Sequence, residues 1–150
     1  MKQIIISEKD FQKARKLIRE NRASQNKIIF SSEDDELNRR ILEKENIDII
    51  LITLSKRKDW MKQRDSGFNQ VLAKIAKSKE TVIGINLNEI LSADKMEKQE
   101  ILARIRQNVR LCNKNKLKME FISQKNIKNR HDLKSLGLIL GMPTWMTRDI

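Results

Sequence analysis

Cysteine, histidine, proline, glycine and aromatic residues are all scarce in this chain of 150 residues. It holds one cysteine (Cys112), one histidine (His131), one proline and four glycines, while aromatic residues make up 4% and tyrosine is absent. A single cysteine excludes a disulfide framework and favours a reducing compartment, so we expect a cytoplasmic location. A single histidine excludes His-rich metal sites and two-histidine catalysis. The low aromatic content argues against binding by base stacking on an aromatic platform.

Long apolar runs are absent as well. The run at residues 4–6 is too short for a signal peptide. The longest apolar stretch, residues 47–54, contains Asp48 and Thr53 and falls far short of the roughly 20 residues that a membrane span needs. Hydrophobic residues still make up 39%, which is enough for one core, and no linker or repeat divides the chain. We therefore expect a single α/β domain over residues 1–150, without a membrane partner.

Short β-type runs alternate with amphipathic helical stretches. Strands are predicted at residues 3–6, 27–31, 47–54, 81–87 and 118–123. Helices are predicted at residues 8–21, from an acidic first turn at 33–36 onward, and at 68–76, 93–113 and 130–140. Gly84 would mark a bulge or a close backbone approach. This alternation indicates parallel strands, arranged either as a small open sheet or as most of a barrel.

Positive charge is concentrated in the second part of the chain. The 32 Lys and Arg against 20 Asp and Glu give a net charge of +12, of which residues 56–150 carry +11. This surplus favours a polyanionic partner such as nucleic acid, although each cluster alone can be a solvated face. The clusters are Lys56, Arg57, Lys58, Lys62 and Arg64 after the third strand, Arg106, Arg110 and Lys114 on the long helix, and Lys125, Lys128, Arg130 and Lys134 after the fifth strand.

No arrangement of residues typical of an enzyme active site is visible. His131 and Asp132 are neighbours in a predicted helix, so their side chains point about 100° apart. Cys112 lies on the apolar face of the long helix and is expected in the core. No Gly-rich phosphate loop is present. We predict no catalytic residue, no metal site and no cofactor of the chain's own.

The segment 64–69, R-D-S-G-F-N, has two interpretations. Asp65 or Ser66 can cap the following helix, and Gly67 allows another backbone to approach closely. Free N–H groups beside Arg64 would suit a phosphate. An ordinary capped helix explains the same residues equally well.

The same segment also resembles a motif of a known protein family. Residues 65–74 resemble the D-S-G-L-N-H-V-L-A segment of archaeal ribonuclease P protein component 3, the family of the thirty-kilodalton protein subunit of eukaryotic ribonuclease P. The motif residues carried over are Asp65, Ser66, Gly67 and Asn69. Departures are Phe68 for the usual Leu, Gln70 for the usual His, and Arg130 where Pro is frequent. The similarity continues in order through the flanking strands at 46–50 and 82–87, the arginine-bearing helix at 104–113, and the closing motif at 132–137 and 140–142.

The resemblance implies a fold of TIM-barrel-like alternating β/α units. Family members carry further strands before the region that matches residue 1, so it implies a shortened or incomplete barrel. It also implies a subunit of ribonuclease P that is not catalytic on its own. That enzyme removes the 5′ leader from precursor tRNA through its RNA subunit, which carries the Mg²⁺.

The implied partners are the ribonuclease P RNA and ribonuclease P protein component 2, and homo- or hetero-oligomers are both open. The RNA contacts would come from the basic residues Arg57, Lys58, Lys62, Arg64, Arg106, Arg110, Lys114, Lys125, Lys128 and Arg130. Two alternatives remain: a degenerate metal-dependent phosphoesterase barrel, and a generic basic RNA-binding module.

Overall fold

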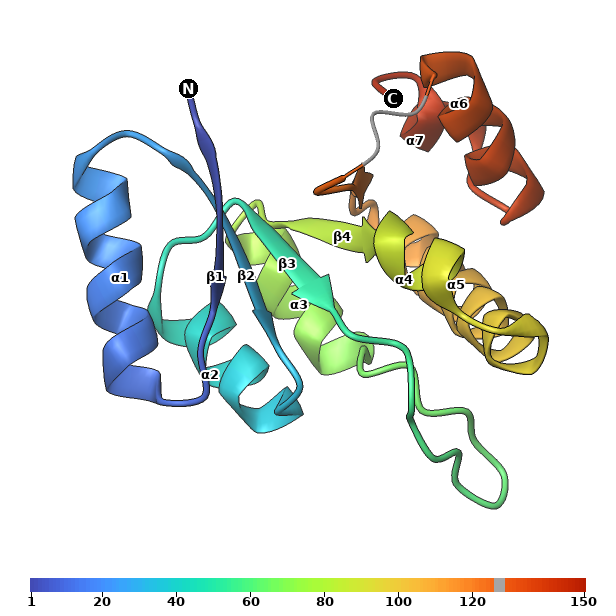
Figure 1. The fold of residues 1–150 in the computed structure, drawn as a ribbon, viewed down its shortest axis with the longest axis horizontal. Helices are drawn as coiled ribbons and strands as arrows, with labels where there is room; N and C mark the ends of the chain where they lie inside the picture. Colours follow the sequence, from blue (N-terminus) through green and yellow to red (C-terminus); the bar gives the residue numbers. More distant parts are fainter. Residues whose placement is uncertain (126–128) are drawn as a thin grey trace.

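The computed structural model describes residues 1–125 and 129–150, which form one parallel sheet with helices between its strands (Figure 1). The strands are β1 (Gln3–Ser7), β2 (Lys27–Ser32), β3 (Ile49–Ile52), β4 (Val82–Asn86) and β5 (Met119–Ile122). The helices are α1 (Phe11–Ala23), α2 (Asp35–Lys44), α3 (Gln70–Ser78), α4 (Leu87–Ser92), α5 (Lys95–Asn115), α6 (Arg130–Ile139) and α7 (Thr144–Thr147). Every predicted strand is present, so the expected α/β class is confirmed.

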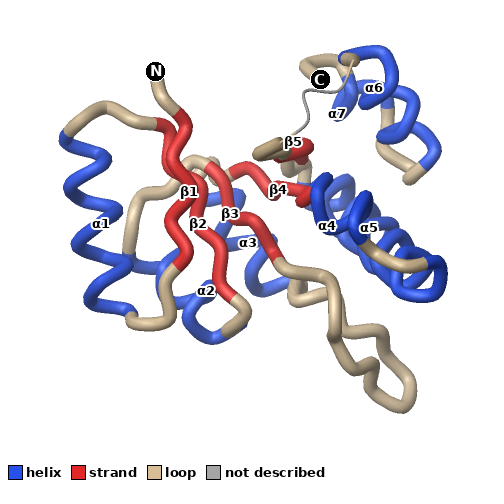
Figure 2. The backbone as a smooth tube through the Cα atoms, in the orientation of Figure 1, coloured by secondary structure: helices blue, strands red, loops and turns tan. Residues whose placement is uncertain are grey.

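The strands lie in the order in which they occur along the chain, β1-β2-β3-β4-β5, and all pairs are parallel. Consecutive large helices pack side by side, α1 on α2, α2 on α3 and α3 on α5. The sheet is strongly twisted, since β1 to β3 run down the view while β4 runs across it (Figure 2). Within the described residues the sheet stays open, with β1 and β5 at its edges. Of the two arrangements left open by the sequence, the structure contains the open sheet, and the TIM-barrel-like part of the expected fold is not confirmed.

Alternate residues of the strands face two apolar clusters, as the period of a β-strand requires. Ile28 and Phe30 belong to the main core between sheet and helices. The smaller cluster consists of Ile29, Ile49, Leu51 and Ile122. Cys112 lies in the main core as expected, and burial raises the pKa of its thiol to about 12. No described helix is both long and apolar enough to cross a membrane.

Three local features differ from the sequence predictions. Gly84 forms no bulge, because it pairs in register with Leu51 and Glu120. A Cβ there would lie 2.9 Å from the Ile49 side chain, so tight packing explains the glycine. The helix predicted from residue 68 begins at Gln70, and Val71 within it is half exposed. Short helices α4 and α7 were not predicted, and α4 begins directly after β4, where Asn86 accepts the N–H groups of two following residues.

Candidate nucleic-acid interface

The connection from β3 to α3, residues 53–69, is a long loop that projects from the carboxyl end of the sheet (Figure 1). This is the end at which parallel α/β sheets usually bind ligands. The loop contains a basic cluster with Arg57, the D-S-G-x-N motif and the groups to which the buried Arg104 binds. Its geometry therefore decides which of the predicted site residues are available to a ligand.

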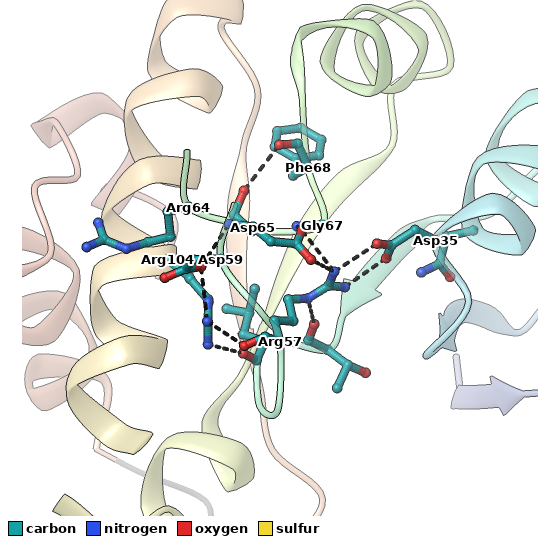
Figure 3. A network of polar contacts seen from close by, with 12 residues as sticks. Asp35, Arg57, Asp59, Arg64, Asp65, Gly67, Phe68 and Arg104 are labelled. Carbon is teal, nitrogen blue, oxygen red and sulfur yellow. Dashed lines mark hydrogen bonds and ion pairs between the residues drawn. The ribbon is translucent and has the colours of Figure 1, made fainter. Parts of the chain in front are cut away.

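Arg57 fastens the loop to α2. Its guanidinium pairs with both carboxylate oxygens of Asp35 at 2.8 Å and with Asp65 at 3.2 Å, and the side chain is only 9% exposed (Figure 3). Burial alone would lower the pKa of Arg57, but hydrogen bonds and attraction from Asp35, followed by Asp65, outweigh it and raise the pKa above its ordinary value. Arg57 is a predicted phosphate ligand whose donors are already occupied by the chain itself.

Arg104 fastens the same loop to α5. Its side chain is 1% exposed and donates to the carbonyl oxygens of Leu54 at 3.0 Å and Arg57 at 2.9 Å, and to Asp59 at 3.1 Å (Figure 3). The backbone N–H of Asp65, then Arg104, lower the pKa of the Asp59 carboxyl. Arg104 was not singled out from the sequence. The signal that could have found it was a cation at position 104 within the apolar series Ile101, Ile105, Val109 and Cys112.

The D-S-G-x-N motif shapes the end of the loop. Asp65 accepts the N–H of Gly67 at 3.0 Å, and the buried Ser66 hydroxyl donates to the Phe68 carbonyl oxygen. Gly67 has a φ of +67°, and a Cβ there would collide with Nη2 of Arg57, so only glycine fits. Asn69, rather than Asp65 or Ser66, caps α3 by accepting the N–H of Leu72. Because the N–H groups of Asp65 and Gly67 are taken, the capped-helix interpretation fits better than the phosphate one.

The remaining cations of the first two clusters form an exposed surface. Among the described residues none of them forms an ion pair with a carboxylate. They are Lys56, Lys58, Lys62 and Arg64 on the loop and Arg106, Arg110 and Lys114 on α5. Arg64 points away from the buried network (Figure 3). Together with Arg106 and Arg110 it lines a shallow groove of about 400 Å³. Gln107 donates to the Arg64 carbonyl oxygen at 3.2 Å, so the fold joins two clusters that are far apart in sequence.

The third predicted cluster is not joined to this surface by any described contact. Lys125 is exposed and lines a different hollow of about 620 Å³, near the carboxyl ends of β3, β4 and β5. Lys128 lies outside the described residues. Arg130 begins α6, is exposed and donates to the carbonyl oxygen of Ile150. No three His, Cys, Asp or Glu side chains gather into a possible metal site in residues 1–125 and 129–150.

The chain is thus an α/β protein with a basic surface built from a pinned loop and one helix. No family model matches the sequence. The fold is similar to that of a chain in the cryo-EM structure of archaeal ribonuclease P with mature tRNA, with a TM-score of 0.81 and 23% sequence identity. The match covers 97% of this chain and 62% of the other chain. At this level of identity the likeness establishes a shared fold.

Proposed function

We propose that this chain is a protein subunit of ribonuclease P, binding the catalytic RNA and supporting removal of the 5′ leader from precursor tRNA. The observation that carries the proposal is the fold similarity to a chain of archaeal ribonuclease P over 97% of this chain. The D-S-G-x-N motif adds to it, because its four matching residues fix the loop beside the basic surface. The chain acts as an accessory subunit, and the Mg²⁺ belongs to the RNA.

The exposed cations are the proposed contacts to RNA phosphates. A structured RNA presents closely spaced phosphates, and each lysine or arginine that neutralises one releases a counterion. Arg64, Arg106 and Arg110 share one groove, and Lys114 continues the stripe along α5. Arg57 is left out of this set, since its guanidinium already pairs with Asp35 and Asp65.

We propose that the sheet is an incomplete TIM-like barrel. In support, all strands are parallel and in sequential order, the large helices pack side by side, and a second apolar cluster lines the other face. In the described residues β1 and β5 each pair on one side only. Open edges of this kind are usually covered, so we propose binding to ribonuclease P protein component 2, or self-association. Light scattering with and without component 2 tests this, and a monomer that ignores component 2 would contradict it.

Reconstitution tests the function itself. Precursor tRNA cleavage is measured with the RNA subunit and partner proteins, with and without this chain, over a series of Mg²⁺ concentrations. We expect the chain to raise cleavage or lower the Mg²⁺ requirement, and to cleave nothing without the RNA. RNA-free cleavage that one substitution in this chain abolishes would instead support the phosphoesterase alternative. Tight RNA binding with no effect on cleavage would leave a generic RNA-binding module.

A further inference from the structure

The tip of the loop between β3 and α3 presents a tryptophan to solvent. The Trp60 side chain is 73% exposed and its neighbour Met61 is 99% exposed. A tryptophan left in water forgoes the large stabilisation that burial of its ring provides. The backbone of Trp60 pairs with that of Gln63, since the two residues exchange N–H···O bonds of 2.8 and 3.3 Å that close the tip into a tight turn.

The base of this tip is held firmly. Arg57 and Arg104 bind the loop to α2 and α5, and Asp59, directly before Trp60, accepts hydrogen bonds from Arg104 and from the Asp65 backbone. Trp60 is therefore carried on a stem with a fixed position, which reduces the entropy lost when a ligand binds.

The charges around the tip decide between possible occupants. Lys58, Lys62 and Arg64 flank Trp60 and have no carboxylate partner in the described part of the chain. Asp59, directly before Trp60, is paired with Arg104. Of the acidic residues that line the same hollow as Trp60, which are Asp35, Glu36 and Asp65, two are paired with Arg57. An aromatic face between unpaired cations suits a ligand that combines a flat π-system with phosphates, which is what a single-stranded nucleic acid offers.

We propose that Trp60 stacks on an unpaired base of bound RNA while Lys58, Lys62 and Arg64 hold the adjacent phosphates. The inference rests on the proposed function, because it assumes that this surface meets RNA. Stacking on Trp60 makes the chain prefer RNA with single-stranded segments over continuous duplex, because the bases of a duplex are already stacked. A single tryptophan can stack on a single base, so the low aromatic content of the chain is compatible with this proposal.

The test measures binding of the full chain to a single-stranded oligouridine and to a continuous RNA duplex. Trp60→Ala should weaken single-strand binding by about tenfold, in the range known for loss of one stacked base, and leave duplex binding unchanged. Its salt dependence should equal that of the unaltered chain, because every cation that binds a phosphate is still present. Trp60→Phe should restore most of the affinity. Met61→Ala is the matched control, and it should bind both RNAs like the unaltered chain.

Fluorescence gives a second readout. The chain has two tryptophans, so Trp145→Phe leaves Trp60 as the sole emitter. Single-stranded RNA should quench this emission and duplex RNA should not. Equal binding of Trp60→Ala and the unaltered chain to the single strand, or unquenched emission at saturation, would overturn the inference. Loss of component 2 binding in Trp60→Ala with intact RNA binding would also overturn it, in favour of a protein contact. Failure of reconstitution alone, with single-strand binding through Trp60 intact, would instead remove only the ribonuclease P assignment.

Discussion

The arginines of the β3–α3 loop and helix α5 fall into two groups, one buried and paired within the chain and one exposed to solvent. Arg57 and Arg104 lie inside, where they bind carboxylates and carbonyl oxygens of the chain and hold the loop. Arg64, Arg106 and Arg110 lie outside along one groove, without a carboxylate partner in the described residues. The regional excess of positive charge therefore serves two purposes. Some cations build the loop, and others remain free to meet a polyanion.

The largest expected effect comes from removing an inner arginine. Arg104→Ala deletes its bonds to the buried Leu54 carbonyl and to Arg57 and leaves a cavity at a fully buried position. We expect a loss of about 3 kcal/mol in the free energy of unfolding. Urea denaturation measures this loss. Arg106→Ala, two residues away on the exposed face, is the control and should stay within about 0.5 kcal/mol. Similar losses for both variants would contradict the division into inner and outer arginines.

A smaller effect is expected where Gly67 makes room for Arg57. Gly67→Ala combines a positive φ with a Cβ that would collide with the Arg57 guanidinium, so Arg57 must shift away from Asp35 and Asp65. We expect a loss of about 2 kcal/mol in the free energy of unfolding. Gly141→Ala is a matched control, because Gly141 also has a positive φ but nothing within 4 Å of the added Cβ. It should lose about 1 kcal/mol, the backbone cost alone. Equal losses would show that Arg57 moves without cost.

Much of the fold could be predicted from the sequence. The apolar run at residues 47–54 predicted a buried strand, and the helical spacing of Ile101, Ile105 and Val109 predicted a helix. The structure contains both elements. The exposure of Arg106, Arg110 and Lys114 also followed from helical phase. Helix α4 could not be predicted, because its first residue, Leu87, continues the apolar run of β4 and only the Asn86 cap marks the change.

The partners of the loop residues could not be predicted. Arg57 and Lys58 are adjacent cations in one cluster, yet Arg57 is buried by carboxylates from positions 35 and 65, and the sequence does not bring these together. The motif residues were recognised as a unit, but their roles were not. Asn69 caps helix α3, and Asp65 forms an ion pair with Arg57. Both roles depend on the path of the loop, which the sequence does not reveal.

The outer arginines are tested through salt dependence. The triple variant Arg106→Ala, Arg110→Ala and Lys114→Ala should keep its stability, because these side chains are exposed. Each phosphate left without its cation should flatten the log–log salt dependence of RNA binding by about 0.7–0.9, and affinity should fall for all RNA sequences alike. The control removes as many exposed charges elsewhere, through Lys2→Ala, Lys9→Ala and Lys13→Ala. An unchanged salt-dependence slope in the α5 variant would show that these three cations are only solvated and do not contact phosphates. Equal changes in both variants would show that RNA responds to the overall positive charge of the chain rather than to this surface.

The smallest effect concerns the acid dependence of the inner network. The Asp65 N–H and then Arg104 lower the pKa of Asp59 below its ordinary value of 3.8. A carboxyl with a lower pKa in the folded chain stabilises the fold above the unfolded pKa, and this contribution is lost as pH falls through the folded pKa. Asp59→Asn cannot titrate, so its stability should fall less steeply below about pH 4 than that of the unaltered chain. Urea midpoints for both chains at neutral and acid pH measure the difference, and Asp59 is exposed enough that we expect it to be slight. Parallel curves would show that Asp59 titrates as it does in the unfolded chain, and that the hold of Arg104 on the loop depends on the carbonyls of Leu54 and Arg57 rather than on this carboxylate.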